Sequence, residues 1–174
     1  MDAIASLREG IGVSHWTLEQ CLEGVTPEQA HWQPQGLAHS VAASYAHLAL
    51  SEDGIVHGML QGKAPLSATA WAKTGISVPP PDPTKLEADW GQWAKTVKVD
   101  LPALRQYAQD VYAATDAYLA SLKPEDLDRK IEAMAMGQQS LNYVISTILV
   151  AHPHEHAGEI AAVKGLQGLK GYPF

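Results

Sequence analysis

The sequence predicts an all-α protein, an up-down four-helix bundle with a long connection between its second and third helices. Four segments repeat apolar residues at the three- and four-residue spacing that places them on one face of a helix. Strand signals are nearly absent, and 174 residues are enough for one domain with a substantial core. Because four amphipathic helices can bury their apolar stripes against one another, we expect residues 1–174 to form a single bundle domain.

The first two helices are predicted from their apolar stripes and their end signals. The stripe of the first helix comprises Ile4, Leu7, Ile11, Leu18, Cys21 and Val25. Gly24 and Pro27 close that helix. The second helix covers about residues 40–60, and its expected N-cap region is His39-Ser40, because a serine oxygen accepts hydrogen bonds from amides of the first helical turn.

The third and fourth helices follow the long connection. Residues 61–100 are rich in proline, and a short helix is indicated over residues 85–97. Connections of this length are often functional. The tryptophans of this connection are Trp71, Trp90 and Trp93. The third helix begins at Leu101-Pro102, since proline suits the first turn of a helix, and the fourth covers about residues 139–168.

Composition restricts the partners and the compartment. A net charge of −7 and a pI near 5.5 argue against nucleic acid or an anionic membrane as the main partner. The single cysteine, Cys21, cannot form an intrachain disulfide, and its place on the apolar stripe predicts a buried, unreactive side chain. The N-terminus lacks the basic and apolar regions of a signal peptide, and no apolar run is long enough to span a membrane. We expect a cytoplasmic protein.

Three histidines alternate in the run AHPHEHAGE near the C-terminus. His152 and His156 lie four residues apart and share one helical face, whereas His154 projects to nearly the opposite side. The apolar rhythm through Ile145 and Ile148 continues at positions 152 and 156, so both histidines replace core residues. Two imidazoles at this spacing can bind one divalent metal ion. The alternatives are two hydrogen-bonded core histidines or an exposed histidine-rich turn.

A third ligand must come from another part of the chain. The candidates are the carboxylates and the remaining histidines, His15, His31, His39, His47 and His57. His47 is the best of them, because it lies in the middle of the second predicted helix on a face of small residues. The small residues of that face are Ser44, Ser51, Gly54 and Gly58. They either leave a cavity beside a metal ion or merely allow a neighbouring helix to pack closely.

Four segments follow one another in a recognisable order. Residues 25–34, VTPEQAHWQP, match a link motif L-T-x-E-x-L-x-W-x-P, and Ala46-His47-Leu48-Ala49 lies in a segment that matches a histidine-bearing second helix. Residues 122–127, followed by Gly137, precede a closing motif H-x-x-x-H-x-G-Q-I, which residues 152–160 match in part. Together these segments resemble the DinB-like superfamily, a group of metal-dependent four-helix-bundle proteins related to the bacterial-thiol-dependent S-transferases.

The resemblance implies a metal site made of His47, His152 and His156, with open positions for water or substrate. Glu159 stands where that family has glutamine, and we expect it to act as a catalytic base, a further ligand or a hydrogen-bond acceptor behind a ligand. An ordinary surface carboxylate is the alternative. Pro153 departs from the family pattern, and because it lacks an N–H and crowds the carbonyl four residues earlier, we expect a kink there.

The resemblance also implies the substrates. A small-molecule thiol would bind the metal as a thiolate and attack an electrophilic substrate. Zinc or nickel is the first candidate ion and iron or manganese the next, since imidazole nitrogen alone does not select one divalent ion. His15 and Tyr45 are candidates for the entrance of the site, with packing as the alternative. A homodimer is a further expectation, which the family and the tryptophans favour.

Three other interpretations remain open. The letters HPHEH also fit the inverted zinc-peptidase pattern H-x-x-E-H, with Glu155 as the base, although the bundle periodicity and Pro153 argue against it. A metal-dependent hydrolase would use a bound hydroxide in place of a thiolate. A non-enzymatic metal-binding or stress-response bundle would use the ion only for structure.

Overall fold

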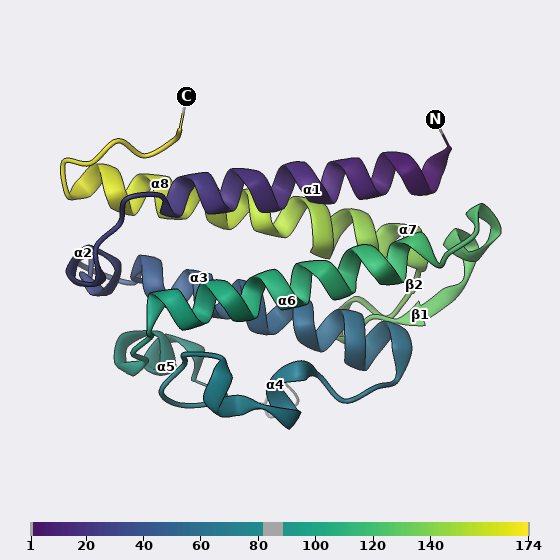
Figure 1. Cartoon of the computed structure of the whole chain (residues 1–174), viewed down its shortest axis with the longest axis horizontal. Coiled ribbons are helices and arrows are strands. Elements are labelled where there is room, and N and C mark those ends of the chain that lie inside the picture. Colours follow the sequence, from purple (N-terminus) through teal and green to yellow (C-terminus); the bar gives the residue numbers. More distant parts are fainter. Residues whose placement is uncertain (1, 82–88, 174) are drawn as a thin grey trace.

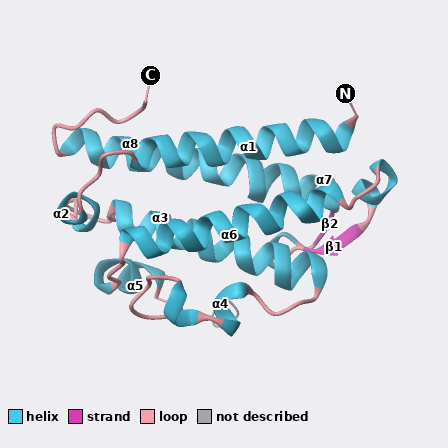
Figure 2. Cartoon of the chain, viewed as in Figure 1, coloured by secondary structure: helices cyan, strands magenta, loops and turns pink. Residues whose placement is uncertain are grey.

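The computed structural model describes residues 2–81 and 89–173, and its four long helical segments pack side by side (Figure 1). The segments are α1 (Ala3–Leu22), α3 (Val41–Asp53) with the π-helix η1 (Gly54–Met59), α6 (Leu101–Ala120), and α7 (Leu141–Val144) with the π-helix η5 (Ile145–Ala151) and α8 (His152–Leu166). Helices dominate the molecule (Figure 2). The predicted all-α four-helix bundle is confirmed.

The long connection sets the direction of the third helical segment. α1 and α3 run in opposite directions, and so do α6 and α8 (Figure 1). The connection returns the chain to the end where α3 begins: the amide of Val99, just before α6, donates to Nε2 of His31 at 3.0 Å. α3 and α6 therefore run in the same direction, while α8 packs against both α1 and α3.

The helix ends follow the predicted signals. Ser40 is the N-cap of α3, and its Oγ accepts a hydrogen bond from the amide of Ala43 at 3.2 Å. Asp100 caps α6 in the same way, with Pro102 in the first turn of the helix. Gly24 lies just beyond α1 with φ +70°, a left-handed conformation that glycine adopts without steric cost. The N-cap and the stop signal predicted from the sequence are both present.

Short elements occupy the connections. α2 (Pro27–His31) lies in the first link, and the antiparallel hairpin of β1 (Lys130–Glu132) and β2 (Gln138–Ser140) joins α6 to α7. The remaining short elements are α4 (Leu66–Thr69), the 3-10 helices η2 (Trp71–Lys73), η3 (Pro124–Asp128) and η4 (Met134–Met136), and α5 (Trp90–Thr96). α5 confirms the second half of the helix predicted over residues 85–97; residues 85–88 lie outside the described residues.

The core fills the space between the helical segments. Among its largest fully buried side chains are Leu18, Leu104, Leu149 and Ile160. Cys21 is also fully buried, as its place on the apolar stripe predicts. Within residues 2–81 and 89–173, no helix combines the length and the apolarity that a membrane crossing requires.

The fourth helical segment leaves α geometry just before Pro153. η5 ends at Ala151, and the next amide, that of His152, donates to the carbonyl of Thr147, five residues earlier. Ser14 of α1 lies against this π turn, with its Oγ 3.0 Å from the carbonyl of Val150 and 3.0 Å from Nδ1 of His154. The irregularity expected around Pro153 thus takes the form of a π turn, a feature that often occurs at functional sites.

Candidate metal centre

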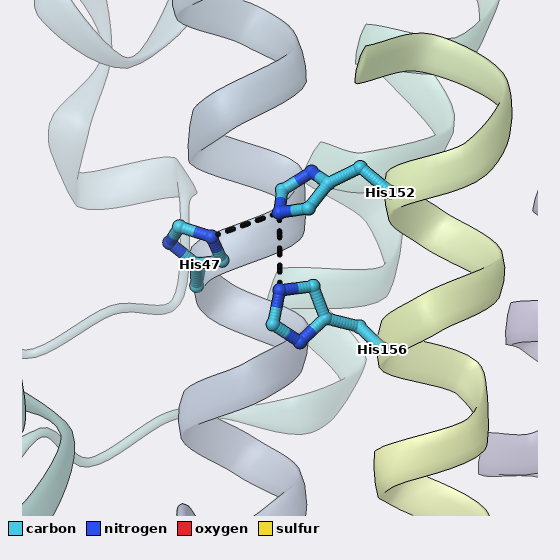
Figure 3. A group of neighbouring side chains, drawn as sticks. All are labelled: His47, His152 and His156. Atoms are coloured by element: carbon cyan, nitrogen blue, oxygen red, sulfur yellow. Dashed lines mark hydrogen bonds between the residues drawn. The ribbon is translucent and has the colours of Figure 1, made fainter. Parts of the chain in front are cut away.

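Three histidines from two helices converge in the bundle (Figure 3). His47 projects from α3, and His152 and His156 project from successive turns of α8. Nε2 of His152 lies 3.3 Å from Nε2 of His47 and 3.0 Å from Nε2 of His156. One nitrogen from each ring lies within 4.8 Å of the other two. The structure therefore brings together the three residues that the sequence analysis selected.

Small side chains accompany the histidines on both helices. Ala43 and Ala46 of α3 and Ala157 and Ala161 of α8 are buried in one hydrophobic cluster. Alanine allows two helix backbones to approach closely, and α3 packs directly against α8. The close approach lets the imidazole of His47 reach the pair on α8.

The three rings fit a divalent metal ion. Two nitrogens bound to a tetrahedral zinc ion at about 2.1 Å are about 3.4 Å apart, close to the separations of 3.3 Å and 3.0 Å. Nδ1 of His156 lies 2.6 Å from Oε2 of Glu159 and so carries the ring proton, which leaves a lone pair on Nε2. A cation between the three rings would accept a lone pair from each of them.

The protein holds two of the ligands in their neutral form. Burial, and after it the nearby His152, His156 and His39 in that order, together lower the pKa of His47 to about 4. Burial also lowers the pKa of His152, with His156 as the next cause. Metal ligation requires the neutral imidazole. At neutral pH, His47 and His152 are therefore ready to bind an ion without first losing a proton.

Two polar side chains lie behind the ligand nitrogens. Glu159 contacts His156 one turn along α8, and Oγ of Ser51 makes a longer contact of 3.5 Å with Nδ1 of His47. A carboxylate behind a metal-binding histidine fixes its tautomer and makes the opposite nitrogen a better ligand. Glu159 lies on the far side of the His156 ring from His152, which matches the expectation of a hydrogen-bond acceptor behind a ligand.

A small cavity of about 110 Å³ opens beside the histidines, and we call it the inner pocket. His47, His156, His39, Ser44, Trp90 and Trp93 line it, together with two alanines. The ring of Trp90 meets His47 edge-on, with a distance of 5.4 Å between the ring centroids. Of the four small residues predicted on the face of His47, Ser44 lines this cavity, whereas Ser51, Gly54 and Gly58 do not.

A second hollow of about 290 Å³ shares His39 and Ser44 with the inner pocket, and we call it the outer groove. Leu37, Val163, Leu166 and Glu159 line it as well. A larger hollow of about 510 Å³ lies elsewhere, between the end of α1 and the start of α6, and it borders none of the three clustered histidines. The two hollows that share His39 and Ser44 therefore provide the approach to the candidate metal centre.

The third histidine of the run, His154, faces away from the centre. Nδ1 of His154 lies 2.9 Å from the carbonyl of Val150, next to α1, so this residue is absent from the cluster, as predicted from its helical position. Glu155 is exposed. The sequence contains the pattern H-x-x-E-H, but its proposed base, Glu155, lines neither the inner pocket nor the outer groove.

His15 and Tyr45 lie in a separate buried polar network. Nε2 of His15 pairs with Oε2 of Glu52 at 2.9 Å, and the hydroxyl of Tyr45 donates to Glu19 at 2.6 Å. Neither residue lines the inner pocket or the outer groove. Packing, the alternative interpretation given for both residues, agrees with these contacts.

Sequence reasoning missed the buried carboxylates of α3. Glu52 accepts a hydrogen bond from the hydroxyl of Thr115, and Asp53 accepts one from the hydroxyl of Tyr107 at 2.6 Å. Asp53 also accepts the amides of residues 66 and 67, so it anchors the start of the long connection to the bundle. The signal was present, since Glu52-Asp53 interrupts the apolar stripe of the second predicted helix.

The fold and the site define a helical bundle with a candidate three-histidine metal centre. A family profile described as the DinB superfamily matches residues 15–160, and the chain belongs to that superfamily. The crystal structure of a conserved protein from Enterococcus faecalis is similar in fold, with a TM-score of 0.79 and 23% sequence identity over 95% of this chain and 97% of that one. No functionally curated protein matches the chain.

Proposed function

We propose that this protein binds one divalent metal ion through His47, His152 and His156 and acts as a transferase that activates a low-molecular-weight thiol. The observation that carries the proposal is the convergence of three ring nitrogens from α3 and α8. Zinc or nickel is the proposed ion, because both accept imidazole nitrogen readily.

A divalent ion held by three neutral imidazoles keeps its full positive charge, and it lowers the pKa of a thiol or water that binds it. The protein's own residues prepare this chemistry. Burial keeps His47 and His152 neutral, and Glu159 holds the proton of His156 on Nδ1. We propose that Glu159 thereby orients a ligand, in place of acting as the base.

The surroundings favour a thiol over water. Trp90 and Trp93 make the wall of the inner pocket largely apolar, and sulfur loses less hydration than oxygen when it enters such a site. The resemblance of the motifs to the thiol-dependent S-transferases points the same way. A metal-dependent hydrolase and a non-enzymatic metal-binding bundle are the outcomes that would replace this proposal.

Metal content tests the proposed ligands. The untagged protein should carry about one divalent ion per chain by elemental analysis, and His47→Ala should lose it, because two ligands from one helix do not complete a stable site. His154→Ala is the matched control: it removes a histidine between the two proposed ligands of α8, and the ion should remain. Full metal content in His47→Ala would overturn the proposed ligand set.

Calorimetry tests whether the metal centre prefers a thiol to a hydroxyl group. The metal-loaded protein is titrated with 2-mercaptoethanol and with ethylene glycol, which has an oxygen where the thiol has sulfur. We expect binding and proton release for the thiol alone, seen as a heat that depends on the ionisation enthalpy of the buffer. Metal without thiol binding would favour the non-enzymatic bundle, and ester hydrolysis without thiol binding would favour the hydrolase.

A further inference from the structure

Two polar side chains beside the candidate metal centre, those of His39 and Ser44, have no hydrogen-bond partner among residues 2–81 and 89–173. Seven of the eight histidines place a ring nitrogen against another polar group. His39 is the exception among the residues that the structure describes, with neither a hydrogen bond nor an ion pair. It is partly exposed and lines both the inner pocket and the outer groove.

Ser44 is the second such residue. It is only 4% exposed, yet its hydroxyl makes no hydrogen bond with any described residue. A helical serine commonly donates to the carbonyl four residues earlier, but the hydroxyl of Ser44 does not, and only its amide donates to that carbonyl, of Ser40, at 3.0 Å. No fully enclosed polar atom lacks a partner in the described part of the chain, so the Ser44 hydroxyl keeps some accessible surface, and Ser44 lines both the inner pocket and the outer groove.

The two residues stand where the hollows meet. Ser44 lies one helical turn before His47 on α3, and His39 directly precedes the N-cap of that helix. The other walls are largely apolar, with Trp90 and Trp93 in the inner pocket and Leu37 and Leu166 in the outer groove. The Ser44 hydroxyl and the His39 ring are both open to these hollows and bond to no described residue, so each is free to bind a polar group that comes from outside the chain.

We propose that His39 and Ser44 bind the single polar group of a mostly apolar organic substrate, which enters through the outer groove and places its reacting end in the inner pocket. The inner pocket, at about 110 Å³, accommodates one small ring or a short chain. Glu159 at the wall of the outer groove disfavours an anion. The substrate class is therefore a neutral molecule with one hydrogen-bonding group. This inference rests on the proposed function for the identity of the reacting end.

The test compares two probes of similar shape, benzamide and toluene, because only benzamide carries a hydrogen-bonding group. Binding to the ¹⁵N-labelled, metal-loaded protein is followed through the indole N–H signals of Trp90 and Trp93. We expect benzamide to shift both signals. Ser44→Ala and His39→Leu should each weaken benzamide binding about tenfold, the effect of one lost hydrogen bond. The affinity for toluene should stay within about twofold.

Ser6→Ala is the matched control, since Ser6 is an exposed serine of α1; it should bind both probes as the parent protein does. The inference is overturned if benzamide leaves the two indole signals unchanged, or if both variants bind benzamide as tightly as the parent. If either result is found in a protein that still binds the metal and the thiol, only this inference fails and the proposed function stands. Selective benzamide binding in a protein that binds no thiol would overturn only the proposed function.

Discussion

At the scale of single residues, the candidate centre depends on which nitrogen of each imidazole carries the proton. Glu159 fixes this for His156, because a carboxylate 2.6 Å from Nδ1 requires a donor there. The sequence placed His152 and His156 on one helical face and His154 on nearly the opposite side, since residue spacing decides in which direction a helical side chain projects. It left three roles open for Glu159, and the contact with His156 supports the proposed role of a hydrogen-bond acceptor behind a ligand.

Removing Glu159 should weaken metal binding without abolishing it. We expect Glu159→Ala to lower the affinity for zinc by about 10- to 100-fold, because the ring of His156 loses the partner that orients it. Competition with a fluorescent zinc chelator measures the change. Glu155→Ala provides the control, since Glu155 is exposed one turn earlier on the same helix. Equal affinities in the two variants would contradict an orienting role for Glu159.

At the scale of the elements, the π turn before Pro153 is the feature that the sequence only partly predicts. Pro153 predicts an irregular helix because proline has no N–H to donate to the carbonyl four residues earlier. The π turn contacts Ser14, which belongs to α1 and lies 136 residues away in sequence from Val150. No pattern within the fourth helix contains this information.

Ser14→Ala should therefore destabilise the bundle. Ser14 is fully buried, and its hydroxyl contacts the carbonyls of Gly10 and Val150 and Nδ1 of His154. Its loss should lower the free energy of unfolding by about 1–2 kcal/mol. Urea unfolding should show a lower midpoint at an unchanged slope. The exposed Ser6→Ala provides the baseline, and a midpoint for Ser14→Ala as high as this baseline would rule out a stabilising role for the contacts.

At the scale of the whole molecule, the partly buried His47 links the candidate metal centre to the stability of the fold. The pKa of His47 is about 4 in the folded protein, against 6.5 for an ordinary histidine. Between these values the unfolded chain binds a proton that the folded chain does not, so the free energy of unfolding falls as the pH drops from 6.5 to 4. The full shift corresponds to about 3 kcal/mol in the metal-free protein.

Urea unfolding of the metal-free protein at several pH values between 4 and 7 measures this effect. His47→Gln has no imidazole to protonate at this position and should show a shallower dependence on pH in the same window. The explanation fails if the two proteins lose stability equally on acidification.

The sequence by itself determined the all-α bundle, its long connection and the two helical faces that carry His47, His152 and His156. These features follow from local periodicity, capping residues and spacing, which neighbouring residues in the chain specify. The tertiary structure decided which residues from other parts of the chain lie beside these two helical faces. It alone brought Trp90 beside His47, left Ser44 and His39 facing open hollows, and buried Glu52 and Asp53 with their partners. Such contacts join residues distant in the chain, and they depend on how the helices pack rather than on the pattern within any one of them.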